Sequence, residues 1–187
     1  RGIGDSSLVV DDYLSALFER SVIHDSRGEE PSAAAHAHPP SMNEVAIPLP
    51  QFDRRTGNQR LEIVGAGIYN QYFEPIAACN SEDLVVIRLT LKNNSIPENV
   101  PLVVGYIFRN QLGVDIASTN SKIEGVSVPY IPIGSVATVQ IKIKFPRLHP
   151  GSYAFCPTAG YIETPPSVVL SDRLDNALIL GVHSNWE

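Results

Sequence analysis

The sequence is poor in the residues and motifs that usually reveal a chemistry. Its 187 residues include only two cysteines, one methionine and one tryptophan, and 18% of its side chains are charged. No apolar run approaches the roughly 20 residues that a membrane-spanning helix needs. The glycine-rich P-loop, the G-x-S-x-G nucleophile turn and the H-E-x-x-H zinc motif are all missing. These absences argue against nucleotide-phosphate binding and against catalysis by this stretch, so we expect no enzyme and no cofactor.

The cysteines and histidines do not form a recognisable metal or redox motif. Cys79 and Cys156 are far apart in the sequence, so we predict buried free thiols, with a disulfide or a reactive thiol as the alternative. His36 and His38 stand close together with His24 nearby. No carboxylate or cysteine lies at ligand spacing from them in a structured element, and we therefore predict no metal site.

The acidic character of the chain belongs to its first 50 residues. The net charge is −6, and residues 1–50 contain three basic and eight acidic side chains, whereas the remainder contains eleven basic and twelve acidic ones. A near-neutral remainder argues against nucleic acid as a partner.

Three regions follow one another along the chain. After Asp5, apolar residues recur at helical spacing, which predicts an amphipathic helix over residues 6–22 within a first region, 1–23. Such a short helix is marginal alone in water, so we expect it to dock on a partner chain or on a domain that precedes it. Residues 24–50 contain five prolines and predict a flexible linker. The residue pattern of 51–187 predicts a β domain.

The β domain shows strict two-residue alternation in several places. It is clearest over residues 84–93 and 135–145, and residues 101–120 predict a hairpin around a turn at 109–113. The glycines in 60–70 predict a bulge or a close backbone approach. We expect residues 165–176 to form a long loop and 177–182 to form the last strand. About seven alternating strands, each with a polar and an apolar face, predict an all-β fold of two antiparallel sheets, a β-sandwich.

Two outward rows of polar side chains form the first candidate binding surface. One row lies on residues 84–93 and the other on 135–145, and they would form a cationic patch if the two strands are neighbours. Such a patch could hold an anionic sugar or a phosphate. The alternative is a solvated sheet face whose lysines block edge pairing. The candidate residues are Arg88, Thr90, Gln140, Lys142 and Lys144.

The outward face of the 101–120 hairpin forms the second candidate. Together with the strand after the turn at 149–151 it presents small or apolar side chains, which suit a docked polypeptide or a flat sugar ring. The residues of this surface are Val103, Gly105, Ile107, Ser152, Ala154 and Cys156, bordered by Tyr106, Arg109 or Tyr161.

Short motifs in the β domain resemble a known family. They are Val104-Gly105-Tyr106, Leu112-Gly113-Val114, Ser118-Thr119-Asn120, the turn and strand from Leu148 to Tyr153, and Ser81-Glu82-Asp83-Leu84. In order and spacing they resemble the C-terminal domain of Wzt, the ATPase subunit of O-antigen polysaccharide ABC exporters. The resemblance covers residues 55–183, and the helix containing Val10 and Phe18 resembles the end of the ATPase domain.

The resemblance implies an immunoglobulin-like antiparallel β-sandwich without catalytic activity. Such a domain binds the non-reducing end of a lipid-linked O-polysaccharide, which often carries a cap. The implied setting is a homodimer, in which a terminal strand can be exchanged, joined through its parent ATPase to a membrane transporter subunit at the cytoplasmic face of the inner membrane. The alternative function is a dimerisation or docking module without glycan readout.

No sugar-contact motif transfers from the family to this sequence, so the predicted contacts rest on the strand patterns alone. The predicted carbohydrate-binding residues are Arg88, Thr90, Gln140, Lys142, Lys144, Tyr106 and Arg109.

Overall fold

The computed structural model describes residues 22–23 and 46–183 of the chain. This part contains eleven strands and no helix. The strands are β1 (Val22–Ile23), β2 (Arg54–Thr56), β3 (Leu61–Asn70), β4 (Ala78–Asn80), β5 (Leu84–Asn93), β6 (Leu102–Arg109), β7 (Asp115–Asn120), β8 (Val136–Lys144), β9 (Gly151–Thr164), β10 (Ser167–Asp175) and β11 (Leu178–His183).

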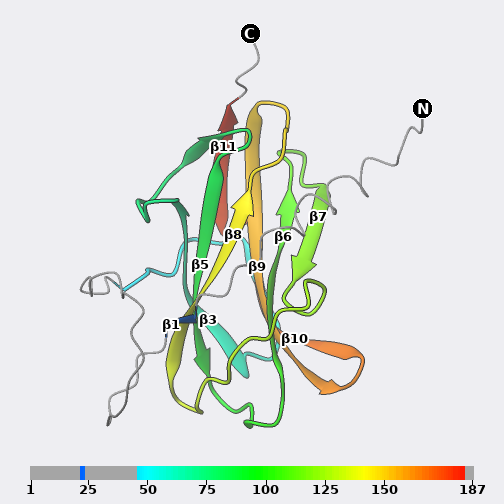
Figure 1. Ribbon diagram of the computed structural model, residues 1–187. Helices are drawn as coiled ribbons and strands as arrows, with labels where there is room; N and C mark the ends of the chain where they lie inside the picture. The colour runs from blue at the N-terminus through cyan, green and yellow to red at the C-terminus, as the bar shows by residue number, and fades with distance from the viewer. Residues whose placement is uncertain (1–21, 24–45, 184–187) are drawn as a thin grey trace.

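The described strands form two sheets that pack face to face, and Figure 1 shows β5 and β8 of one sheet to the left of β9 and β6 of the other. The first is a four-stranded sheet in the order β1-β8-β5-β3. The second is a seven-stranded sheet built from β2, β4, β6, β7, β9, β10 and β11. All pairs are antiparallel except β4 with β11. This architecture confirms the prediction of an all-β antiparallel sandwich.

The core lies between the two sheets and is formed by the residues that the alternation places inward. The four inward aliphatic side chains of β5 are fully buried, and those of β8 face them from the neighbouring strand. Phe108 and Phe155 pack with a ring centroid distance of 4.6 Å, and Tyr153 stacks on Phe108 at 5.2 Å. The inward rows predicted from the sequence for 84–93 and 135–145 are therefore confirmed.

Strand β9 is the central strand of the larger sheet. Its residues 154–161 pair with β6 along one edge. Along the other edge, β11 pairs with residues 151–155 and β10 pairs with residues 158–164. The β9–β10 hairpin extends beyond the body of the sandwich at the lower right of Figure 1.

The prediction of a long loop over residues 165–176 is wrong, because residues 167–175 form strand β10. This strand lacks a simple alternation, because its pairing with β9 shifts register twice and two consecutive polar side chains are buried. Ser171 accepts a 2.7 Å hydrogen bond from the backbone N–H of Leu61, and Asp172 accepts one of 2.7 Å from the backbone N–H of Ile63. These partners lie about a hundred residues earlier, so a local pattern cannot reveal that the two polar residues are inside.

The N-terminal regions are described only in part. The helix predicted over residues 6–22 lies outside the described residues, except for Val22, which belongs to strand β1 and pairs with Val139 of β8 instead of being helical. Most of the predicted linker, 24–45, is also outside the described residues. Its end packs on the sandwich, since Ile47 is buried and the N–H of Ala66 donates to the carbonyl of Pro48 at 3.1 Å.

The glycines of β3 confirm the predicted bulge and close approach. The pairing of β3 with β5 shifts register between Ile63 and Gly65. A Cβ atom at Gly65 would lie 2.2 Å from the carbonyl oxygen of Ile47. Only a glycine therefore leaves room for the chain that precedes the sandwich to cross here.

Cys79 and Cys156 are buried free thiols, as predicted. Residues 22–23 and 46–183 contain no group of three or more His, Cys, Asp or Glu side chains that could hold a metal ion, and His24, His36 and His38 lie outside this part. No helix in the same part is long and apolar enough to cross a membrane.

Candidate functional site

The outward face of the seven-stranded sheet is hollowed in two places along β6 and β9, and we call the two hollows together the trough. The smaller hollow has a volume of about 240 Å³ and the larger about 730 Å³. The smaller is lined by Val103, Tyr106, Ile107, Ser118, Thr119, Asn120, Thr158, Ala159, Gly160, Val168 and Leu170. The larger is lined by Gln51, Phe52, Asp53, Asn110, Gln111, Gly113, Ser152, Tyr153, Ala154, Asn176, Ala177 and Ile179.

Two glycines allow β7 and β10, the walls of the smaller hollow, to lie close to its floor on β6 and β9. A Cβ atom at Gly105 of β6 would lie 2.2 Å from the carbonyl oxygen of Thr119 in β7. A Cβ atom at Gly160 of β9 would lie 2.5 Å from the carbonyl oxygen of Val169 in β10. Any larger residue at either position would push its wall away. The smaller hollow thus depends on glycine at both sides of the floor.

Amide and hydroxyl groups surround the larger hollow. Asn176, in the left-handed region with φ +55°, donates from Nδ2 to the Asp53 carboxylate at 2.7 Å. Its backbone N–H donates to the Cys156 sulfur at 3.2 Å. Ser152 and Gln111 are exposed at the rim. These side chains are the donors and acceptors that the hydroxyl groups of a saccharide require.

Arg109 lies beside the larger hollow, and carboxylates engage its guanidinium. Its Nε donates to Asp115, and its Nη1 lies 3.5 Å from Asp175. The hydrogen bond to Asp115 raises the pKa of Arg109, against the opposing effect of burial. Arg54 also pairs with Asp175, at 3.1 Å. The positive charge of Arg109 is therefore balanced within the protein.

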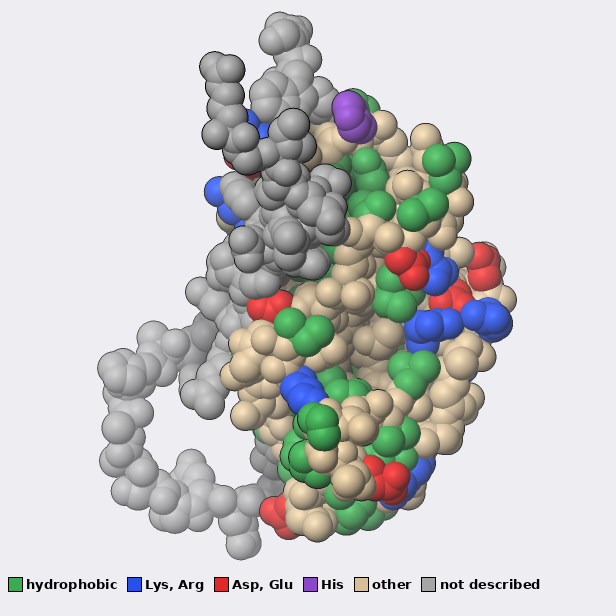
Figure 2. Space-filling view, turned by 90° about the vertical axis from the view of Figure 1, so that its right-hand side faces the viewer, with side chains coloured by type: hydrophobic (Ala, Val, Ile, Leu, Met, Phe, Trp, Pro, Cys, Tyr) green, Lys and Arg blue, Asp and Glu red, His purple; other side chains and the backbone are tan. Residues whose placement is uncertain are grey.

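The trough carries very little charge of its own. Among the described residues that line the two hollows, Asp53 is the only Asp, Glu, Lys or Arg. Figure 2 shows the side of the molecule with the β9–β10 hairpin, where uncharged surface predominates; several blue and red side chains gather near the right edge, and others are scattered over the rest of this view.

The predicted cationic patch is assembled on the opposite sheet. Strands β5 and β8 are neighbours, and Arg88 pairs with Gln140. Lys142 lies opposite Val86, and Lys144 lies opposite Leu84. The condition for the predicted patch, that these two strands are neighbours, is therefore met.

Parts of this patch are less accessible than the sequence suggested. Gln140 is only 5% exposed although it points away from the core, and Thr90 is half-buried with its hydroxyl 3.3 Å from that of Thr138. Lys144 is exposed.

Tyr106 and Arg109 lie apart from the cationic patch, on the other sheet. Tyr106 is 2% exposed, and its ring packs edge-on against Phe155 in the core at 5.3 Å. Tyr106 is also one of the residues that line the smaller hollow. The seven predicted contact residues therefore occupy three separate places.

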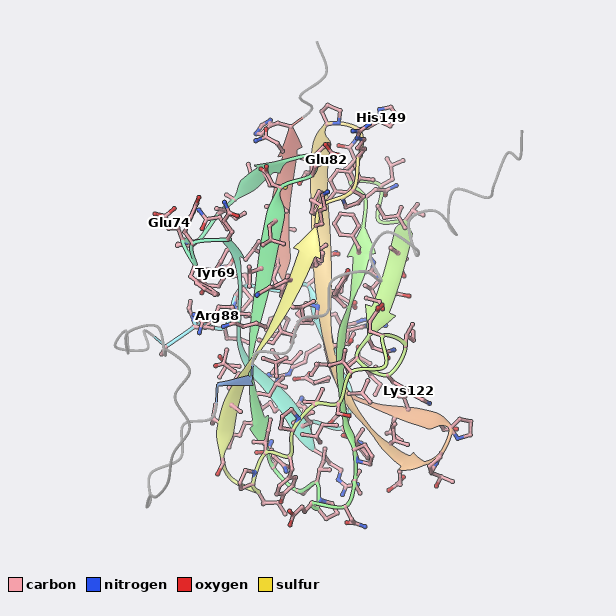
Figure 3. The ribbon with its side chains drawn as sticks, viewed as in Figure 1. Tyr69, Glu74, Glu82, Arg88, Lys122 and His149 are labelled. Atoms are coloured by element: carbon pink, nitrogen blue, oxygen red, sulfur yellow. The ribbon has the colours of Figure 1, made fainter. Side chains whose placement is uncertain are left out.

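Sequence reasoning missed three aromatic residues near Arg88: Tyr69 and Phe73 flank its guanidinium, and Tyr72 precedes Phe73 in the same loop. We call these three residues and Arg88 the shelf. The Arg88 guanidinium carbon lies 5.6 Å from the centre of the Tyr69 ring and 5.9 Å from that of Phe73. Tyr72 and Phe73 belong to the loop between β3 and β4. Figure 3 shows Tyr69, Glu74 and Arg88 together on the left side of the molecule. The signal in the sequence was two adjacent aromatic residues inside a polar turn.

Comparison with known proteins identifies a family and a number of similar solved structures. The family described as "Wzt C-terminal domain" matches residues 53–186. The crystal structure of the C-terminal domain of Wzt superposes with a TM-score of 0.62 at 16% sequence identity, covering 78% of this chain and 90% of that chain. At this identity the structural match shows the fold alone.

The other comparisons add no argument about function. No curated protein matches the chain. A family 123 glycoside hydrolase from Clostridium perfringens, studied for glycolipid glycan hydrolysis, matches with a TM-score of 0.34 at 16% identity, over 67% of this chain and 27% of that one. A TM-score of this size is too low to support an inference.

Proposed function

The chain belongs to the Wzt C-terminal domain family, and from this membership we propose that it binds the non-reducing end of an O-antigen polysaccharide for export. A Wzt C-terminal domain is a non-catalytic part of an ABC transporter subunit, in keeping with the expectation that this stretch is not an enzyme. In this proposal it acts as a homodimer, in the cytoplasm at the inner face of the inner membrane, where its parent ATPase joins the transporter.

The observation that supports this proposal is the trough along β6 and β9. Its two hollows lie on one sheet face, with small floor residues such as Gly160 and Ala154. Saccharide rings are flat, with hydroxyl groups at their edges, so they fit a shallow apolar floor bordered by amides and hydroxyls. The cationic patch on the other sheet is the rival location for the same function.

The charge of the trough indicates an uncharged glycan terminus. A bound phosphate or carboxylate would need a cation that the protein does not already neutralise. Asp53 would repel such a group, and Arg109 already pairs with Asp115 and Asp175. We therefore propose that the end recognised in the trough is neutral, with an apolar cap or no cap.

Titration of the full chain with purified O-polysaccharide from its source tests the proposal. Ser118→Trp fills the smaller hollow and Ser152→Trp fills the larger, and both serines are exposed, so the fold tolerates the change. We expect each to raise Kd at least about tenfold, a change of about 1.4 kcal/mol. Ser135→Trp, at an exposed turn outside both hollows, is the matched control and leaves Kd unchanged.

Two further measurements separate the trough from the cationic patch. For a neutral terminus, raising NaCl from about 50 to about 500 mM changes Kd by less than about twofold, because no charge pair is screened. Lys144→Ala likewise leaves Kd unchanged. A strong salt dependence together with a loss in Lys144→Ala would assign the glycan to the cationic patch. Absence of binding by the unaltered chain would refute glycan recognition altogether.

The docking function remains the second candidate, because the same small-residue face suits a flat protein partner. Ala154 lies on the trough floor between β6 and β11. Ala154→Arg would place a long cation on this face. If that change converts a dimer to a monomer in sedimentation while glycan affinity is retained, the face is a subunit interface instead of a glycan site.

A further inference from the structure

We propose that the shelf on the four-stranded sheet is a second glycan-contact site, which takes the apolar face of a sugar ring from the polysaccharide. This inference rests on the proposed function, but it concerns the outward face of β3 and β5, which is the opposite side of the sandwich from the trough.

The shelf presents two aromatic rings that contribute little to the fold. Tyr72 is 72% exposed and Phe73 is 45% exposed. Phe73 also has a φ of +62°, in the left-handed region that bulky residues rarely adopt. A half-exposed phenylalanine in a costly backbone conformation stabilises the fold less than the same side chain would in the core. Such strain is typical of a position selected for binding.

The loop that presents these rings is closed by several hydrogen bonds. The side-chain oxygen of Asn70 accepts hydrogen bonds from the N–H groups of Tyr72 at 2.9 Å and Glu74 at 3.0 Å. The Asn70 amide nitrogen donates to the Glu74 carboxylate at 2.8 Å. The backbone closes the turn between Asn70 and Phe73 at 3.0 Å. A preorganised loop loses little conformational entropy when a ligand stacks on it.

The sheet beneath the loop is shaped to hold the third ring. A Cβ atom at Gly67 would lie 2.8 Å from the Tyr69 ring, so the ring lies directly over this glycine. Arg88 pairs with Gly67 across the strands and places its guanidinium beside the rings of Tyr69 and Phe73. Cation–π contacts of this kind fix the orientation of both rings.

The size and surroundings of the shelf favour a sugar over a protein partner. Its exposed apolar surface comes from two adjacent side chains, and Asn70, Glu74 and Arg88 border it. A stable protein interface buries roughly 800 Å² on each partner, which two rings cannot supply. One or two sugar rings match this area, with C–H groups on the aromatic faces and hydroxyls toward the polar border.

The test compares shelf variants of the full chain in titrations with the purified O-polysaccharide. Tyr72→Ala removes the most exposed ring. Phe73→Asn removes the second ring while keeping a residue that tolerates positive φ. We expect each to raise Kd about three- to tenfold. Ile133→Ala, at an exposed apolar residue on another loop, is the control and leaves Kd unchanged.

Each outcome separates the two proposals. Loss of affinity in the shelf variants, with unchanged thermal midpoints, supports the second site. Kd values within twofold of the unaltered chain, while Ser118→Trp still weakens binding, overturn the shelf and leave the trough intact. Weakened association with the transporter subunit at unchanged glycan affinity would also overturn it, in favour of protein docking. If Phe73→Asn fails to fold, Tyr72→Ala alone decides. Absence of binding by the unaltered chain overturns both proposals.

Discussion

Replacing Asp172 by asparagine removes the centre of a buried network that fixes β10, one wall of the trough, to the rest of the sandwich. The carboxylate is fully buried and accepts hydrogen bonds from Arg55 Nε at 3.0 Å, from Arg55 Nη2 at 2.6 Å and from the Ile63 N–H at 2.7 Å. The pKa of Arg55 is raised first by its hydrogen bond to Asp172, although burial acts against this rise.

Asparagine has the same shape but only one acceptor oxygen. Whichever way the amide turns, its NH₂ group faces a donor, so at least one charge-assisted hydrogen bond worth about 1.5–3 kcal/mol is lost. The partly buried Arg55 then keeps Glu62 as its remaining carboxylate, at 3.2 Å. Breaking a buried ion pair costs about 3–5 kcal/mol, and we discount this for the partial exposure of Arg55. We expect Asp172→Asn to lower the free energy of unfolding by about 3 kcal/mol.

Urea unfolding followed by circular dichroism measures this change. With an m-value of about 1–3 kcal/mol per molar, the midpoint should fall by about 1–3 M at unchanged m. Glu62→Gln is the control, because this more exposed partner should contribute less than about 1 kcal/mol. A loss below about 1 kcal/mol in Asp172→Asn would refute the reasoning, since it would mean that the network does not hold β10 in place.

Three other predictions concern separate parts of the fold. Asn93→Ala should cost about 2–4 kcal/mol in urea unfolding, because the buried amide donates to Ile96 at 2.8 Å and Ile131 at 2.7 Å; a loss below about 1 kcal/mol would contradict this. Gly160→Ala should cost about 1–3 kcal/mol by overpacking against β10, whereas Gly151→Ala, which has room for a methyl group, serves as the control; equal thermal midpoints would count against the wall contact. Burial, with Asp83 adding to it, raises the pKa of the Cys79 thiol from 9.0 to about 12. As pH rises, the thiol of the unfolded state therefore loses its proton before that of the folded state. The free energy of unfolding should fall between about pH 9 and 12, by at most about 1.4 kcal/mol per pH unit for this thiol. Cys79→Ala should reduce that slope, and an unchanged slope would refute the assignment.

The strands that the sequence revealed are those whose pattern is local. Val85, Ile87, Leu89 and Leu91 face one core, so the period of two is visible without knowing any partner. Strand β10 was missed because its inward positions include Ser171 and Asp172. These side chains are satisfied by β3 and by Arg55, which only the folded chain brings near.

The candidate site was predicted less well than the fold, because it depends on contacts between distant segments. The neighbouring rows on β5 and β8 were found correctly, but the burial of Gln140 was not visible in the pattern. The walls of the smaller hollow follow from how closely β7 approaches Gly105 and β10 approaches Gly160. The shelf was within reach of sequence reasoning, since Tyr72 and Phe73 stand in a turn where apolar residues are unusual.

The length of β9 has a mechanical consequence. At about 3.3 Å per residue, its fourteen residues extend for about 46 Å under both hollows. A polymer gripped in the trough and pulled along this axis would load the ladders to β6, β10 and β11 in shear, so that many hydrogen bonds resist together instead of opening one after another. A pull across the strands would instead peel β7 from the edge, where β6 is its one paired neighbour among the described strands. The sandwich should therefore withstand tension far better along the trough than across it.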